Sequence, residues 1–166
     1  GKAQPEIGGV ELIGDKKVSY CPQEVDIDES LTIMEYIDKV ISKKDYELTL
    51  IEVKSVLTKL EITDFSKPIK ELSGGNKRKL ALGVSIATPC DLLILDEPFV
   101  GLDPEAALIV KNLMKDLCKE GGSVFFSTHV LEVAEKLCNK IPRQLRWRGI
   151  ESFNGIRHFL LLILSL

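Results

Sequence analysis

The apolar positions along this chain follow two different periods. Over residues 31–60, the segments LTIMEYIDKVISK and ELTLIEVKSVLTKL place apolar residues at i, i+3 and i+4, which predicts amphipathic helices. By contrast, Leu92–Leu95 is a short continuous apolar run with acidic residues on both sides, which is typical of a strand buried on both faces in a parallel sheet. Val18–Cys21 and Ser123–Ser127 are further predicted strands.

A helix is predicted between the second and third of these strands. Residues 103–105, DPE, supply an N-cap, a first-turn proline and an early acid, and the helical spacing of apolar residues that follows ends near the glycines at 121–122. Strand, helix and strand together predict a βαβ unit. We expect a second helix over Val130–Lys140.

The predicted elements divide the chain into four parts. Residues 1–29 and 89–141 form an α/β core, and a mostly helical insert, residues 30–88, interrupts it. Residues 142–166 are an atypical tail that holds four of the five arginines and no lysine. A basic tail that contains the only tryptophan, Trp147, is typical of a segment that binds a membrane surface or nucleic acid. The alternative is that the tail is not native coding sequence but the product of a frameshift or gene-model error.

Composition adds few constraints. The net charge of −3 gives no global indication of nucleic-acid binding, so we expect no nucleic-acid partner. The four cysteines form no C-x-x-C pair, which favours free thiols in a reducing cytosol. The N-terminus carries no signal-peptide pattern. The longest apolar run, Phe159–Leu164, is far shorter than the roughly 20 residues that a membrane span needs.

Polar residues follow three of the predicted strands, at what is expected to be one edge of the sheet. Asp96 can hold Mg²⁺ beside a phosphate, and the adjacent Glu97 can orient or deprotonate an attacking water. The other interpretation is that these acids only mark where the strand reaches solvent. His129 can bond a γ-phosphate or the attacking water, although a helix-capping histidine fits the same position. The amide oxygen of Gln23 can complete a metal shell, although a solvated loop glutamine fits as well.

A serine and two glycines precede a basic, apparently helical run in the stretch ELSGGNKRKL. Ser73 is a favourable N-cap, and Gly74 and Gly75 allow close approach of the backbone to a ligand. Backbone N–H groups at such a helix start can bind a phosphate. The alternative is an ordinary capped helix whose basic residues, 77–79, form a solvated face.

Five segments, in this order, resemble the nucleotide-binding domain of ABC (ATP-binding cassette) ATPases. YCPQ, which ends at Gln23, resembles the Q-loop. LSGGNKRKL at Leu72–Leu80 is similar to the ABC signature. LLILDEP at Leu92–Pro98 resembles Walker B with its catalytic glutamate. GLDP at Gly101–Pro104 resembles the D-loop, and STH at Ser127–His129 the H-loop.

The resemblance covers about residues 5–141. It implies an α/β fold, a partial P-loop NTPase-like parallel sheet core with an inserted helical signature subdomain, together with ATP as substrate and Mg²⁺ as cofactor. Gln23 would bind Mg²⁺ and sense the transmembrane partner, and Asp96 would hold the Mg²⁺ shell. Glu97 would polarise the water that attacks the γ-phosphate, and His129 would contact that phosphate.

The resemblance also implies partners. Ser73, Gly74 and Gly75 would cap the γ-phosphate of ATP held by a second nucleotide-binding domain, in a homodimer or a heterodimer. Asp103 would contact that opposite subunit. The chain would lie in the cytoplasm on the inner face of the cell membrane, bound to a transmembrane permease subunit. The leading hypothesis is an ATP-hydrolysing transporter subunit of export or ABC-2 type. The alternatives are a soluble ABC-type ATPase and an inactive, pseudogene-like remnant.

Two features depart from the family pattern. No Walker A loop stands in the sequence, because Gly1-Lys2 is followed by Ala3 in place of Ser or Thr, so we expect that loop upstream of residue 1. Without it, this chain alone is expected to bind ATP weakly and to hydrolyse essentially none. After Ile141 the family continues with a hydrophobic strand, whereas PRQLRWRG disfavours a buried strand.

Overall fold

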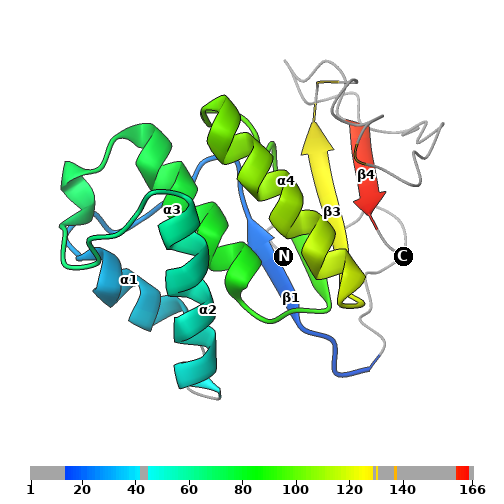
Figure 1. Ribbon diagram of the computed structural model, residues 1–166, viewed down its shortest axis with the longest axis horizontal. Coiled ribbons are helices and arrows are strands. Elements are labelled where there is room, and N and C mark those ends of the chain that lie inside the picture. The colour runs from blue at the N-terminus through cyan, green and yellow to red at the C-terminus, as the bar shows by residue number, and fades with distance from the viewer. Residues whose placement is uncertain (1–13, 42–44, 129, 131–136, 138–159, 165–166) are drawn as a thin grey trace, which may run out of the picture.

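A four-stranded sheet in the order β1-β2-β3-β4 organises the molecule (Figure 1). The computed structural model describes residues 14–41, 45–128, 130, 137 and 160–164. Strands β1 (Val18–Cys21), β2 (Leu92–Leu95) and β3 (Ser123–Thr128) are parallel, which confirms the predicted parallel core. Strand β4 (Leu160–Leu164) pairs antiparallel with β3. The tail therefore supplies a strand that the sequence analysis did not predict.

The connection from β2 to β3 is the predicted βαβ unit. Helix α4 (Pro104–Lys119) begins where Asp103 Oδ1 accepts a hydrogen bond from the backbone N–H of Ala106 at 2.8 Å. The chain leaves the helix at Gly121, whose φ of +92° suits a residue without a side chain. The helix predicted at Val130–Lys140 lies outside the described residues, except for positions 130 and 137.

The insert is helical, as predicted. Helices α1 (Ile33–Val40) and α2 (Tyr46–Lys59) are followed by a short 3₁₀ turn at Ile69–Glu71 and by α3 (Gly74–Ala87). Helix α1 starts with a capping box between Thr32 and its third helical residue. Helix α3 packs against both α2 and β1, so it connects the insert to the sheet (Figure 1).

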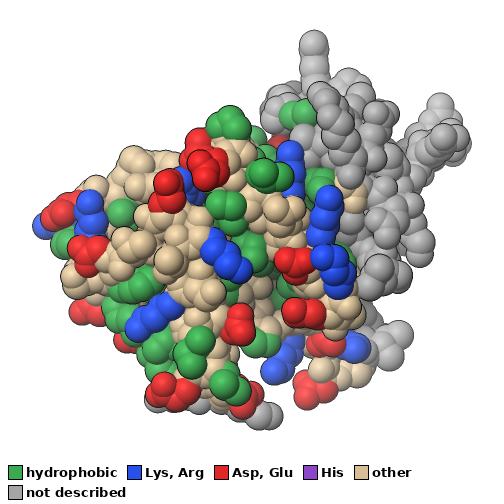
Figure 2. Space-filling model, in the orientation of Figure 1, with side chains coloured by type: hydrophobic (Ala, Val, Ile, Leu, Met, Phe, Trp, Pro, Cys, Tyr) green, Lys and Arg blue, Asp and Glu red, His purple; other side chains and the backbone are tan. Residues whose placement is uncertain are grey.

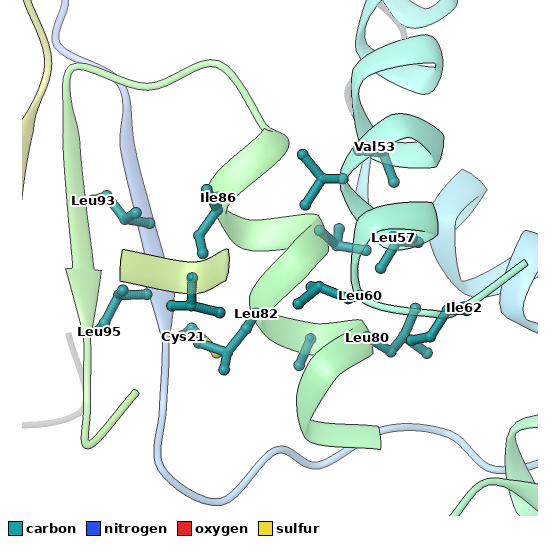
Figure 3. Packing of buried hydrophobic residues seen from close by; sticks show 14 of the residues in the cluster. Cys21, Val53, Leu57, Leu60, Ile62, Leu80, Leu82, Ile86, Leu93 and Leu95 are labelled. Atoms are coloured by element: carbon teal, nitrogen blue, oxygen red, sulfur yellow. The ribbon is translucent and has the colours of Figure 1, made fainter. Parts of the chain in front are cut away.

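One buried apolar cluster runs through the insert and the sheet. Figure 3 shows side chains of α2 and α3 interdigitating beside those of β1 and β2. Leu93 and Leu95 are fully buried, whereas Leu92 and Ile94, on the opposite face of β2, are only half-buried. The strand was predicted to be buried on both faces, but only one face is fully buried. That face carries Leu93 and Leu95, and α3 packs against it.

Charged side chains of both signs are mixed over the visible surface. Figure 2 shows Lys and Arg side chains interspersed with Asp and Glu across this face rather than gathered in one basic area. An even mixture of charges does not produce the positive stripe that follows a nucleic-acid backbone. The expectation of no nucleic-acid partner stays a prediction.

Candidate functional site at the carboxyl edge of the sheet

The residues that follow the parallel strands meet at one edge of the sheet. The register pairs Cys21 of β1 with Leu95 of β2, and Leu95 with Phe126 of β3. Asp96 therefore follows β2 at the level of Pro22, one residue before Gln23, and the backbone N–H of Asp96 donates to the carbonyl of Cys21 at 2.9 Å. This is the edge where open α/β sheets bind ligands. His129, which was expected beside them, lies outside the described residues.

Ser127 fixes the acidic pair that ends β2. Its hydroxyl donates to Asp96 Oδ1 at 2.5 Å and accepts the backbone N–H of Glu97 at 2.9 Å. The Ser127 side chain is buried, so the bond to Glu97 is shielded from water, whereas the bond to Asp96 is only part-buried. Sequence reasoning gave this serine no role of its own, since a serine at the end of a strand has no distinctive signal.

Glu97 occupies an unusual backbone position. Its φ is +47°, in the left-handed region, which costs a residue with a side chain about 1–3 kcal/mol. Its carbonyl accepts the N–H of Val100, and the whole residue is only 5% exposed. An acid that merely marked the end of the strand would extend into solvent. The structure instead holds Glu97 in one buried conformation at the carboxyl edge.

The signature stretch opens α3 at the surface. Ser73 is the predicted N-cap, and its hydroxyl accepts the N–H of Asn76 at 3.2 Å. Ser73 and Gly74 are exposed. A Cβ on Gly75 would lie 3.2 Å from the carbonyl oxygen of Gly101, so the start of α3 contacts the D-loop closely. The exposed N–H groups of this helix start can bind an anion presented from outside the chain.

The basic residues after the glycines do not form a solvated face. Arg78 is 7% exposed, and its guanidinium donates to main-chain carbonyls in two loops. Nη1 donates to the carbonyls of Pro22 and Gln23, the latter at 3.0 Å. Nη2 donates to the carbonyls of Asp96 at 2.7 Å and Glu97 at 3.2 Å. The alternative of a solvated basic face is therefore wrong for this residue.

Lys79 is also buried and connects α3 to the D-loop. Its ammonium lies 2.8 Å from Asp103 Oδ2 and 3.3 Å from Glu61 Oε2. The hydrogen bond to Asp103 raises the pKa of Lys79 despite the opposing effect of burial. The pKa of Asp103 is lowered, first by the N–H of Ala106 and then by Lys79. Both carboxylate oxygens of Asp103 thus bind groups of this chain, and its contact with an opposite subunit stays a prediction.

The donor set at this edge fits a magnesium ion that also binds phosphates. Mg²⁺ usually takes one or two carboxylates and completes its shell with water and substrate phosphates. Asp96 supplies a half-buried carboxylate, and Gln23 supplies an exposed amide at the same edge. Within the described ranges, no group of three or more His, Cys, Asp and Glu side chains is arranged to hold a metal by itself.

A cavity of about 400 Å³ lies at the opposite edge of the sheet. Cys90 and Gly122, which precede β2 and β3, line it together with Val56, Ile86 and Leu117. It is therefore formed at the amino ends of the strands. It takes no part in the arrangement around Asp96 and Glu97.

Comparison with known proteins decides the family. The family model described as ABC transporter matches residues 10–100, which is more than half of the chain. This chain belongs to the ABC transporter family. The human ATP-binding cassette sub-family A member 2 is 35% identical over 149 residues, which cover 86% of this ABC chain and 6% of that protein.

Two microbial proteins are also similar to this chain. An uncharacterized ABC transporter ATP-binding protein of Methanocaldococcus jannaschii is 35% identical over 141 residues, covering 81% of this chain and 52% of that protein. Nod factor export ATP-binding protein I of Burkholderia thailandensis is 28% identical over 158 residues, covering 85% and 51%. The chain thus spans about half the length of these two relatives.

Solved structures confirm the ABC fold. An ATP-binding subunit of an ABC transporter superposes with a TM-score of 0.66 at 27% identity, covering 74% of this chain and 52% of that one. A dimeric ATP-binding cassette bound to ADP and Pi gives a TM-score of 0.60 at 21% identity, covering 72% and 55%, which shows the fold alone. None of the helices in the described ranges has the length and apolar character that a membrane crossing requires.

Proposed function

We propose that this chain is part of the ATP-hydrolysing subunit of an ABC transporter of export type. The observation that carries the proposal is the acidic pair at the carboxyl end of β2, with Asp96 bound by Ser127 and Glu97 buried beside it. The name of one relative, the Nod factor export ATP-binding protein I, supports the export type. In this proposal, residues 30–88 form the signature subdomain, and residues 1–29 and 89–141 belong to the ATPase core.

The residues at the carboxyl edge would act on the chain's own nucleotide. Asp96, with the amide of Gln23, would hold Mg²⁺, which neutralises charge on the β- and γ-phosphates when it is bound. Glu97 would orient the water that attacks the γ-phosphate, as a carboxylate beside the magnesium-binding acid can do. His129 would donate a hydrogen bond to the same phosphate.

The start of α3 would act on the nucleotide of a partner. Ser73, Gly74 and Gly75 present a capped helix N-terminus to the outside of the chain, where it can bind the γ-phosphate of ATP held by a second nucleotide-binding domain. The ion pair between Lys79 and Asp103 keeps the D-loop against this helix start. In this arrangement a transmembrane permease subunit would bind at the Q-loop, and the chain would work at the cytoplasmic face of the membrane.

The replacement Glu97→Gln in the full-length protein tests the proposal. The amide keeps the size of the side chain but removes its charge, so the variant should bind MgATP as tightly as the wild type. Because it should not complete hydrolysis, it should accumulate as an ATP-bound dimer, visible in size-exclusion chromatography. A variant that stays monomeric with ATP and hydrolyses it normally would contradict the assignment of Glu97.

A further inference from the structure

Four main-chain carbonyls from two separate loops converge on one side chain. Arg78 Nη1 donates hydrogen bonds to the carbonyls of residues 22 and 23 in the loop after β1, and it lies 3.7 Å from the sulfur of Cys21. Nη2 donates hydrogen bonds to the carbonyls of residues 96 and 97 in the loop after β2. Each terminal nitrogen of the guanidinium is thus dedicated to one loop.

This arrangement needs the forked shape of arginine. A guanidinium presents its donors in a rigid plane, so two nitrogens can serve two acceptor pairs at once, whereas a lysine ammonium is a single point. The residue is 7% exposed, and its Nε has no partner among the described residues. An unsatisfied buried donor costs about 1–3 kcal/mol. If this position only needed a side chain to fill the buried volume, an apolar residue would fit it without that cost.

We propose that Arg78 is a positioning residue that couples the signature helix to both loops of the catalytic edge. The inference rests on the proposed function, since one loop carries Gln23 and the other carries Asp96 and Glu97. Ser73, which caps α3, precedes Arg78 by five residues, about 7.5 Å along a helix axis. Contact of a partner's phosphate with Ser73 would shift α3, and Arg78 would move both loops with it.

Hydrogen exchange in the full-length protein, without nucleotide, tests the coupling itself. Three amides of the β2 loop report on its order. The N–H of Asp96 donates to the carbonyl of Cys21, that of Glu97 to the hydroxyl of Ser127, and that of Val100 to the carbonyl of Glu97. In Arg78→Met, these amides should exchange about tenfold faster, while the amides of β2 and β3 keep their rates. Unchanged loop amides, or an equal increase throughout the sheet, would overturn the proposal.

Two further variants separate position from charge and from general stability. Arg78→Lys keeps a positive charge and a similar volume, and it replaces the methionine variant if that protein does not fold. The loop amides of this variant should also exchange faster than in the wild type, because one ammonium cannot bind the carbonyls of both loops. If the loop amides of Arg78→Lys exchanged at the wild-type rate, a positive charge alone would be sufficient, which would overturn the proposal. Lys77→Met, which removes the half-exposed ion pair with Glu29, is the matched control and should leave the loop amides unchanged.

Turnover then shows whether the coupling serves catalysis. For Arg78→Lys, phosphate release should fall about tenfold or more, as expected when reacting groups are displaced. Binding of ATP in the presence of EDTA should stay within about twofold, since Arg78 contacts only the loops. If Arg78→Lys released phosphate at the wild-type rate although its loop amides exchanged faster, the role of Arg78 in catalysis would be overturned. If the wild-type protein releases no phosphate, the proposed function fails, while the exchange rates still decide whether Arg78 couples the loops.

Discussion

Replacing Ser127 with alanine should loosen the carboxyl edge of the sheet without removing any charged group. The hydroxyl makes two bonds, donating to Asp96 Oδ1 at 2.5 Å and accepting the N–H of Glu97 at 2.9 Å. Alanine leaves that N–H without its acceptor in a part of the fold where Ser127 itself is 6% exposed. It also leaves the Asp96 carboxylate without its hydroxyl donor.

The size of the effect follows from these two losses. An orphaned buried N–H costs about 1–3 kcal/mol, and a hydrogen bond to a charged group contributes about 1.5–3 kcal/mol. Asp96 is half-buried and regains some hydration, so the second loss falls near its lower limit. We therefore expect Ser127→Ala to lower the free energy of unfolding by about 2–4 kcal/mol, a large part of the stability of a domain.

Urea unfolding of the full-length protein measures this change. With a slope near 2 kcal/mol per molar urea, the midpoint should fall by about 1–2 M. Ser123→Ala, at the other end of the same strand, is the matched control and should change the stability by less than about 0.5 kcal/mol. Equal midpoints for the two variants would refute the reasoning that Ser127 holds the acidic pair in place.

Two further substitutions test the packing and the charges around α3. Gly83→Val should destabilise the protein by about 3 kcal/mol in urea unfolding, because even a Cβ would lie 2.6 Å from Cδ2 of buried Leu57; a neutral effect would contradict this close packing. Asp103→Asn should lower the melting temperature near neutral pH, and this difference should shrink as the pH falls well below the ordinary aspartate pKa of about 3.9. The reason is that Ala106 N–H and Lys79 lower the pKa of Asp103, and the stability gained above its unfolded pKa is lost on protonation. A pH-independent difference would contradict that linkage.

The strands of the parallel core were predictable because each is a local signal. Leu92–Leu95 is an apolar run bounded by acidic residues, and both it and Val18–Cys21 begin and end at the predicted residues. The sequence patterns do not predict strand β4, although Phe159–Leu164 is the longest apolar run of the chain. Its pairing with β3 depends on a partner more than thirty residues away, which no local pattern reveals.

Helical spacing indicates the burial of one basic residue in the signature helix but not of the next. Arg78 lies four residues before Leu82 and eight before Ile86, so helical spacing placed it on the face that packs against the sheet. That signal was available. The burial of Lys79 was not predictable in the same way, because Glu61 and Asp103 come close to it only in the folded chain.

The meeting of the site residues at one edge was predictable, but their hydrogen bonds were not. Gln23 and Asp96 follow parallel strands, so their common edge follows from the order of the elements. The role of Ser127 depends on the register between β2 and β3, and a shift by one residue would turn its side chain to the other face.

Phosphate release from MgATP tests the central claim most directly. The measurement compares the full-length wild-type protein with Glu97→Gln at saturating nucleotide. If Glu97 orients the attacking water at the carboxyl edge, the wild type turns over and the variant is slower by about a hundredfold or more, the contribution expected of a general base. Equal turnover by the two proteins would contradict the account.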